Sequence, residues 1–137
     1  MIVMTCLDDK GGMMFNHRRQ SQDRILREDV LNTAGERKLW LNSYSARQFT
    51  PEQQDRLQIS ENFLAEASEG AFCFVEQGPL GPVEEKIEQL ILYKWNRLYP
   101  SDVRLDLPLA EHGWVLKESR DFAGSSHEKI TREVYSR

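Results

Sequence analysis

The feature that most constrains this chain is a series of short apolar runs separated by short helical segments, with a strand at the very end. In the second half, apolar residues 71–75 lead through a Gly/Pro turn at 77–81 into a charged helix, residues 82–88. A second apolar run follows, residues 89–95, and then a Tyr-Pro break. Strands separated by helices of this size favour parallel crossover connections. The closing segments, residues 114–118 and 130–135, are typical of an antiparallel hairpin at the edge of the sheet.

The first half continues the alternation. Residues 2–7 form an apolar run that ends in a Gly-containing turn at 8–12, which predicts a buried strand. A helix follows, with Ser21 as its N-cap, Asp23 in its first turn and Gly35 as its stop. Its apolar stripe has helical spacing and comprises Ile25, Leu26, Val30, Leu31 and Ala34.

Further elements lie between this helix and residue 70. Residues 38–42 predict a strand, and Ser43 predicts the cap of a short helix through Phe49. Thr50-Pro51-Glu52-Gln53 has the form of a capping box, and Ser60 predicts the cap of another helical piece. We therefore expect a single α/β domain over residues 1–137, with a mostly parallel central sheet flanked by helices and a C-terminal antiparallel hairpin.

Charge and composition exclude several classes of function. Against 18 Lys and Arg stand 22 Asp and Glu, a net charge of −4, which argues against a protein built to coat nucleic acid or an anionic membrane. No apolar run approaches the roughly 20 residues of a membrane helix, and the N-terminus lacks the basic start and apolar length of a signal peptide. We therefore expect a cytoplasmic protein. Cys6 and Cys73 are expected as buried free thiols; a disulfide would require neighbouring strands.

The second half of the chain combines residues 84–92 before a strand, Tyr99-Pro100-Ser101-Asp102, a Trp-centred strand and a terminal strand closing in Tyr135-x-Arg137. In these features it resembles dihydrofolate reductase. The first half is compatible with that family in its order of strand, Gly-containing loop at 9–19, helix and strand. The resemblance implies a dihydrofolate reductase-like fold.

The departures from that family concern its cofactor, NADPH. The resemblance implies a glycine pair after the strand at 71–75, where a backbone closely approaches the cofactor phosphates, but this chain carries Glu76 and Gln77. A carboxylate at that place repels phosphate. The family's Gly-Arg-x-Thr, whose arginine meets the 2′-phosphate, corresponds to Asn42-Ser43-Tyr44-Ser45, where the hydroxyl is kept but the cation is absent. The interval between Phe49 and Gly70 also looks too short for a further cofactor-binding strand. We expect no cofactor, and NADPH least of all.

Asp23 has a counterpart in the resemblance, which implies a carboxylate near the start of the first helix that binds the pterin ring. Asp in a first helical turn is also favoured by the helix dipole, with no ligand at all. Both interpretations remain open from the sequence.

A basic, polar cluster precedes the same helix. Arg18 and Arg19, the hydroxyl of Ser21 and free backbone N–H groups predict an anion or phosphate site that could include Asp23. The alternative is a solvated loop whose arginines pair with nearby acidic residues, namely Asp8, Asp9 or Glu28.

A second polar cluster lies in the connection of the closing hairpin, at Ser125, Ser126, His127 and Lys129. Adjacent Ser, His and Glu residues do not make a catalytic triad, because neighbours on a strand point to opposite faces and no nucleophile elbow is present. In a reductase-like fold this hairpin and the first long loop can approach each other, which would form a composite polar site. Asp23 and His127 would then be the candidates for acid–base work.

Metal binding and base stacking have little support. His17, His112 and His127 are scattered without the spacing of metal ligands. The three tryptophans lie in or beside apolar strands, which favours core packing. Residues 93–97 interleave aromatic and basic side chains, a weak signal for nucleic acid that the negative net charge weakens further.

Three hypotheses follow. The preferred one is a reductase-like scaffold that has lost the cofactor site and binds a small anionic or nucleotide-like ligand near the first loop and helix. The second is an enzyme, either a divergent reductase or a hydrolase of a phosphorylated or RNA substrate. The third is a protein-interaction module without a small-molecule site. The oligomeric state is left open.

Overall fold

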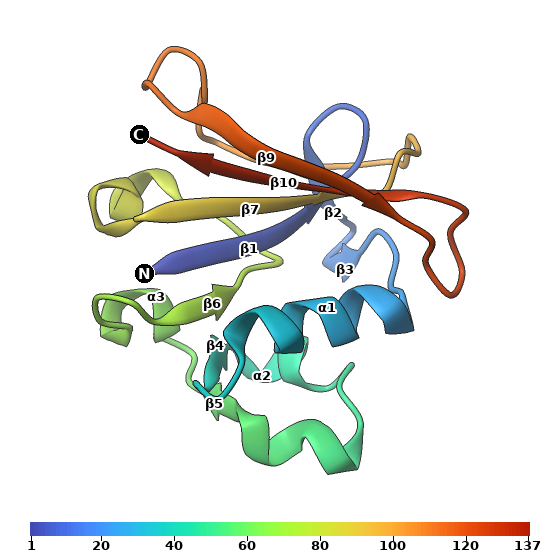
Figure 1. Ribbon diagram of the computed structural model, residues 1–137, viewed down its shortest axis with the longest axis vertical. Coiled ribbons are helices and arrows are strands. Elements are labelled where there is room, and N and C mark those ends of the chain that lie inside the picture. The colour runs from blue at the N-terminus through green and yellow to red at the C-terminus, as the bar shows by residue number, and fades with distance from the viewer.

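The computed structural model describes residues 1–137 without a gap. Its centre is a seven-stranded sheet in the order β5-β4-β6-β1-β7-β10-β9 (Figure 1). These strands are β1 (Ile2–Leu7), β4 (Leu39–Leu41), β5 (Leu57–Ile59), β6 (Phe72–Phe74), β7 (Gln89–Lys94), β9 (Val115–Phe122) and β10 (Ile130–Ser136). The pairs from β5 to β7 are parallel, and β10 is antiparallel to both β7 and β9. The mostly parallel α/β sheet with a closing hairpin is therefore confirmed.

A second sheet was not predicted. It contains three short antiparallel strands in the order β3-β2-β8, formed by Gly12–Phe15 (β2), Arg18–Arg19 (β3) and Val103–Arg104 (β8). The segment 9–19, expected as a loop, folds as a hairpin because Asn16 and His17 both take positive φ, at 52° and 61°. Two such residues give the tight turn whose twist matches that of paired strands.

The main helix covers one face of the large sheet. It spans Arg24–Ala34 (α1), and its N-cap is Asp23, so the prediction of Ser21 as the cap is wrong. The Asp23 carboxylate accepts hydrogen bonds from the N–H groups of Ile25 and Leu26, which are the orphan donors of the first turn. Gly35, at φ 62°, ends the helix as predicted.

The other helices are short. Those with α geometry are α2 (Ser43–Ala46) and α3 (Phe63–Glu66), and the 3₁₀ segments are η1 (Pro51–Arg56) and η2 (Gly81–Lys86). Asn42 caps α2 in place of Ser43, and Asn62 begins α3 in place of Ser60. The capping box at Thr50 and Gln53 is present. The predicted helix at 82–88 is the 3₁₀ segment η2.

Two apolar clusters lie on the two faces of the sheet. One joins α1 to β1 and β7 through residues such as Met4, Leu26 and Ile91. The other packs the opposite face of the same strands, through Val3 and Leu90, against the β2 hairpin and the short helices. Neighbouring positions on β1 enter different clusters because side chains alternate along a strand. Cys73 is buried, Cys6 is half-buried, and both are free thiols.

One expectation about the interval 49–70 is wrong. Although this stretch is short, it holds strand β5, which pairs in parallel with β4 from Leu39 opposite Leu57 to Leu41 opposite Ile59. The interval is long enough for this three-residue strand because η1 ends at Arg56 and β5 begins at the next residue, Leu57. No helix in the protein combines the length and apolar character that crossing a bilayer requires.

Candidate functional site

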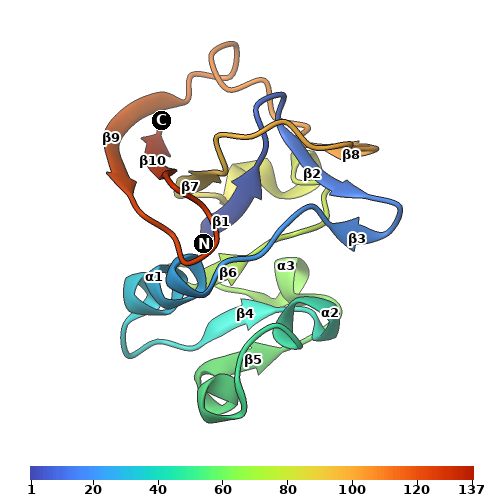
Figure 2. The ribbon, with the colours of Figure 1, turned by 90° about the vertical axis from the view of Figure 1, so that its right-hand side faces the viewer.

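The polar residues singled out from the sequence lie at the carboxyl ends of the parallel strands β1 and β7. Ligands of open α/β sheets bind at this edge, beyond the strand ends. The connection between β9 and β10 folds down over the N-terminal end of α1, as Figures 1 and 2 both show. Residues about 100 positions apart in the chain are thereby brought together.

Asp23 is the centre of this contact. It is only 2% exposed, and its carboxylate accepts hydrogen bonds from the N–H groups of Ser125 at 3.0 Å and Ser126 at 2.8 Å in addition to the two of α1. The fit is close, because a Cβ added to Gly124 would lie 2.3 Å from Asp23 Oδ2. The same carboxylate therefore caps the helix and holds the hairpin connection against it.

His127 completes the network. Its Nδ1 lies 3.0 Å from Asp23 Oδ2, and its Nε2 lies 3.0 Å from Ser21 Oγ and 3.3 Å from the Tyr99 hydroxyl. The ring stacks on Trp95, with centroids 4.5 Å apart and planes inclined by 28°. Because an ionised carboxylate only accepts, Nδ1 carries the proton that points to Asp23, and the lone pair of Nε2 accepts from a hydroxyl when the ring is neutral.

The network keeps Asp23 ionised. Burial by itself raises the pKa of Asp23, but hydrogen bonds from the Ser126 N–H, His127 and the N–H groups of Ser125 and Leu26 outweigh burial and lower this pKa well below its usual range. Asp23 is therefore a fixed negative charge beside the imidazole of His127.

Arg19 does not belong to this network. Its Nε donates to Glu76 Oε2 at 2.8 Å and its Nη2 to Oε1 at 3.1 Å, and the guanidinium lies 4.5 Å from the centre of the Tyr44 ring. Glu76, 8% exposed, also accepts from Ser45 Oγ at 2.8 Å and Gln48 Nε2 at 3.1 Å. Arg19 is thus held in a structural ion pair, with an acidic residue other than the three predicted as its partners.

The Arg18 side chain is exposed and makes no hydrogen bond or ion pair within the protein. Of the acidic residues predicted as its partners, Glu28 pairs with Arg24, and Asp8 accepts main-chain hydrogen bonds from Lys10 and Gly12. Arg18 lines a hollow of about 250 Å³, which we call the first-loop hollow. Its other walls are Phe15, Asn16, Arg19, Gln20, Tyr99 and Pro100. Through Tyr99 and Gln20 the hollow adjoins His127 and Ser21.

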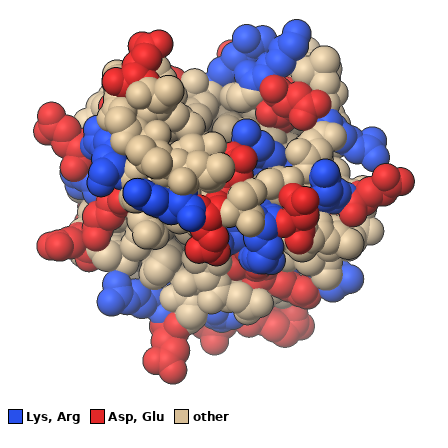
Figure 3. Space-filling view, turned by 45° about the horizontal axis from the view of Figure 1, so that its top comes forward, with Lys and Arg blue, Asp and Glu red and all other residues tan.

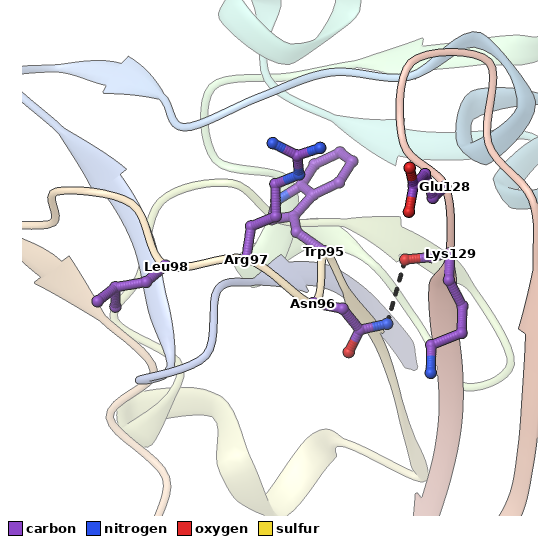
Figure 4. Close-up of a pocket in the computed structure, with 6 residues that line it drawn as sticks. All are labelled: Trp95, Asn96, Arg97, Leu98, Glu128 and Lys129. Atoms are coloured by element: carbon purple, nitrogen blue, oxygen red, sulfur yellow. Dashed lines mark hydrogen bonds between the residues drawn. The ribbon is translucent and has the colours of Figure 1, made fainter.

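A larger hollow, about 610 Å³, lies on the other side of the network (Figure 4). Trp95, Asn96, Arg97 and Leu98 line one side, and Glu128 and Lys129 the other. Lys129 therefore lines this second hollow, and its main-chain oxygen accepts a hydrogen bond from Asn96 Nδ2. Trp95 connects this hollow to the network of Asp23 and His127, because it lines the hollow and its ring stacks on His127.

Charges of both signs alternate over the face shown in Figure 3, with no continuous basic patch. Side chains of His, Cys, Asp and Glu nowhere gather in a group of three that could hold a metal ion. Trp95 and Trp114 are buried in the two apolar clusters.

The structure thus brings together five of the candidate residues, namely Ser21, Asp23, Ser125, Ser126 and His127. Arg18 and Arg19 line the first-loop hollow, and Lys129 lines the larger one. Sequence reasoning missed Tyr99 and Trp95 as partners of His127. Their positions at the end of β7 were the available signal, since side chains there face the same sheet edge as the first loop.

Comparison with known proteins places the fold. No family model matches the sequence, and no curated protein matches it. Among solved structures, the chain is similar to the dihydrofolate reductase from Enterococcus faecalis complexed with NADP(H), with a TM-score of 0.66 and 9% identity over 99% of this chain and 95% of the reductase. The dihydrofolate reductase-like fold is therefore confirmed, and at this identity the similarity concerns the fold alone.

The residues after β6 do not fit the cofactor of that fold. Glu76 is the second residue after β6, and its buried carboxylate holds Arg19 in an ion pair with two hydrogen bonds. The guanidinium and the side chains of Ser45 and Gln48 all converge on this carboxylate. A phosphate here would have to displace Arg19 and accept the repulsion of Glu76.

The buried ion pair leads to a stability prediction. Glu76→Leu or Arg19→Met alone leaves one buried charge without its partner and should lower the free energy of unfolding by about 3 kcal/mol. The double variant should lose less than the sum of the two, by at least about 1 kcal/mol. Urea unfolding measures all three. As a control, the same changes at the exposed pair Arg24 and Glu28 should couple by less than about 1 kcal/mol. Purely additive losses at Arg19 and Glu76 would contradict this account.

The lowered pKa of Asp23 leads to a second prediction. Because its folded pKa lies below the ordinary value of about 3.9, the unfolded chain binds more protons in acid. The stability that Asp23 contributes is therefore complete above about pH 4 and is lost as the pH falls toward the folded pKa. Asp23→Asn should cost about 2 kcal/mol near neutrality and distinctly less at low pH, as measured by urea unfolding. Asp55→Asn, outside the network, serves as the control. A cost that does not change with pH would refute the prediction.

Proposed function

We propose that this protein binds a small anionic or nucleotide-like ligand in the first-loop hollow and is not an NADPH-dependent reductase. The observation that carries the proposal is Arg18, an exposed guanidinium in a hollow at the carboxyl edge of the sheet, without a carboxylate partner. A guanidinium presents planar, paired donors that match carboxylate and phosphate groups.

Two further features support an anionic ligand. The N–H groups of Gln20, Ser21, Gln22 and Asp23 make no hydrogen bond within the protein, and they lie between the hollow and α1. The volume of about 250 Å³ suits a single charged group with a small attached ring, which Tyr99 and Phe15 would contact, while the rest of a larger ligand would extend into solvent.

The case against reductase activity rests on Glu76 and Asp23. Glu76 fills the turn that would receive cofactor phosphates with a buried ion pair. Asp23 is the counterpart of the carboxylate that the resemblance implies binds pterin. Its oxygens already accept hydrogen bonds from main-chain N–H groups and from His127. Neither residue is free for the role that the resemblance implies.

A thermal-shift titration tests the proposal with pyrophosphate, ATP, folate and NADPH. A ligand at a hundred times its dissociation constant stabilises the folded state by about 2.7 kcal/mol, which raises the melting temperature by several degrees. We expect such a shift with pyrophosphate or ATP, weaker at higher salt. Arg18→Glu should remove the shift and leave the ligand-free melting temperature nearly unchanged.

The control is Arg47→Glu, another exposed arginine, at the end of α2 and away from the hollow, which should keep the shift. A shift that survives Arg18→Glu but disappears in Arg97→Glu would move the ligand to the larger hollow and refute the site. Oxidation of NADPH in the presence of dihydrofolate would refute the claim that the protein is not a reductase.

A further inference from the structure

We infer that Ser21, His127 and Asp23 form a nucleophile–base–acid chain and that the protein hydrolyses small esters carrying a negative charge. The inference rests on the proposed function for the binding of that charge. Its basis is geometric: Ser21 Oγ lies 3.0 Å from His127 Nε2, and His127 Nδ1 lies 3.0 Å from Asp23 Oδ2. Such a chain is recognised by its geometry and roles, whatever the order of its members in the sequence.

Each member is held in place. Main-chain hydrogen bonds from α1 and from the hairpin connection fix Asp23, which orients the imidazole and determines its tautomer. Trp95 covers one face of the His127 ring. Ser21 is half-buried, so its hydroxyl is reachable from solvent while His127, 7% exposed, is shielded.

A purely structural clamp does not require the Ser21 end of the chain. Asp23 already joins α1 to the hairpin connection through four main-chain N–H groups. The hydrogen bond between Ser21 Oγ and His127 Nε2 adds a hydroxyl beside a base. The Tyr99 hydroxyl is a second polar group, 3.3 Å from the same Nε2. The unpartnered N–H groups of Gln22 and Asp23 follow directly after Ser21, where an oxyanion formed on its substrate could accept from them.

The reaction uses only water besides the ester. Ser21 Oγ attacks the acyl carbon and passes its proton to His127 Nε2, while the carbonyl oxygen becomes an oxyanion. The C–O bond to the alcohol breaks, and the alkoxide takes the proton from His127 and leaves as the alcohol. Water then attacks the acyl group on Ser21 and gives a proton to His127, which returns it to Ser21 Oγ as the carboxylic acid leaves.

Arg18 selects the substrate class. Its guanidinium lines the first-loop hollow together with Gln20, which precedes Ser21 in the chain, and Tyr99, whose hydroxyl lies 3.3 Å from His127 Nε2. An ester with a carboxylate or phosphate a few bonds from its acyl carbon would place the charge on Arg18 and the acyl carbon near Ser21. Neutral esters lack this second point of attachment and should react more slowly.

The first experiment measures covalent labelling. Phenylmethylsulfonyl fluoride, which sulfonylates activated serines with loss of fluoride, should add one group, located at Ser21 by mass spectrometry. Ser21→Ala should abolish labelling and retain the melting temperature, whereas Ser68→Ala, an exposed serine outside the network, should be labelled like the parent protein. An unlabelled Ser21 in the folded parent protein would overturn the inference.

The second experiment measures turnover of 4-nitrophenyl acetate and of the mono-4-nitrophenyl ester of glutaric acid. Ser21→Ala should lower the rate on both by at least about a hundredfold. His127→Ala should do the same and abolish the loss of rate in acid, and added imidazole should restore part of the activity. A merely structural histidine would show neither the altered pH profile nor the rescue, so their absence in a folded variant also overturns the inference.

The two esters separate this inference from the proposed function. Arg18→Glu should slow hydrolysis of the charged ester at least about tenfold more than hydrolysis of the neutral ester. Equal rates on both esters, with Ser21 labelled, would leave the nucleophile in place and refute the anion site. Pyrophosphate binding that depends on Arg18, with Ser21 unlabelled, would support the anion site and refute Ser21 as a nucleophile.

Discussion

The site depends on one carboxylate. Asp23 satisfies the first N–H groups of α1, accepts two more from the hairpin connection and holds the His127 imidazole, all while 2% exposed. A buried charge is tolerated only when hydrogen bonds replace its hydration, and Asp23 has them on every side. The closing hairpin is thereby fastened to the first helix, and the carboxyl edge of the sheet acquires a fixed shape.

The sequence predicted the parts of the fold that depend on local pattern. The strand at 2–7, the helix ending at Gly35 and the strand from 89 lie where apolar periodicity placed them. The second sheet was not predicted because it requires His17 in a left-handed conformation and a partner strand about 90 residues along the chain. Helix starts were displaced by one or two residues, since Ser21 and Asp23 are equally acceptable caps by type and only the hairpin connection favours Asp23.

For the candidate site, the sequence predicted which residues take part but not which of them contact one another. Ser21, Asp23 and His127 were all predicted as site residues. A catalytic triad was rejected because the residues adjacent to His127 in the sequence would point to the opposite face of a strand. The serine that meets His127 is 106 positions away, which no local rule detects. Glu76 illustrates the same limit. Its charge predicted that phosphate would be repelled, but its partner, Arg19, lies 57 residues away and had been assigned to another role.

These pairings determine which polar groups remain open at the carboxyl edge of the sheet. The reductase-like fold brings the first loop, the first helix and the closing hairpin to the same edge. In this chain a buried ion pair, Arg19 with Glu76, fills the turn after β6, so the polar groups that remain open lie nearer α1. There a fixed carboxylate orients a base toward a hydroxyl, beside an unpaired guanidinium. The ester hydrolysis that we propose needs only these side chains and water, and it does not depend on a cofactor.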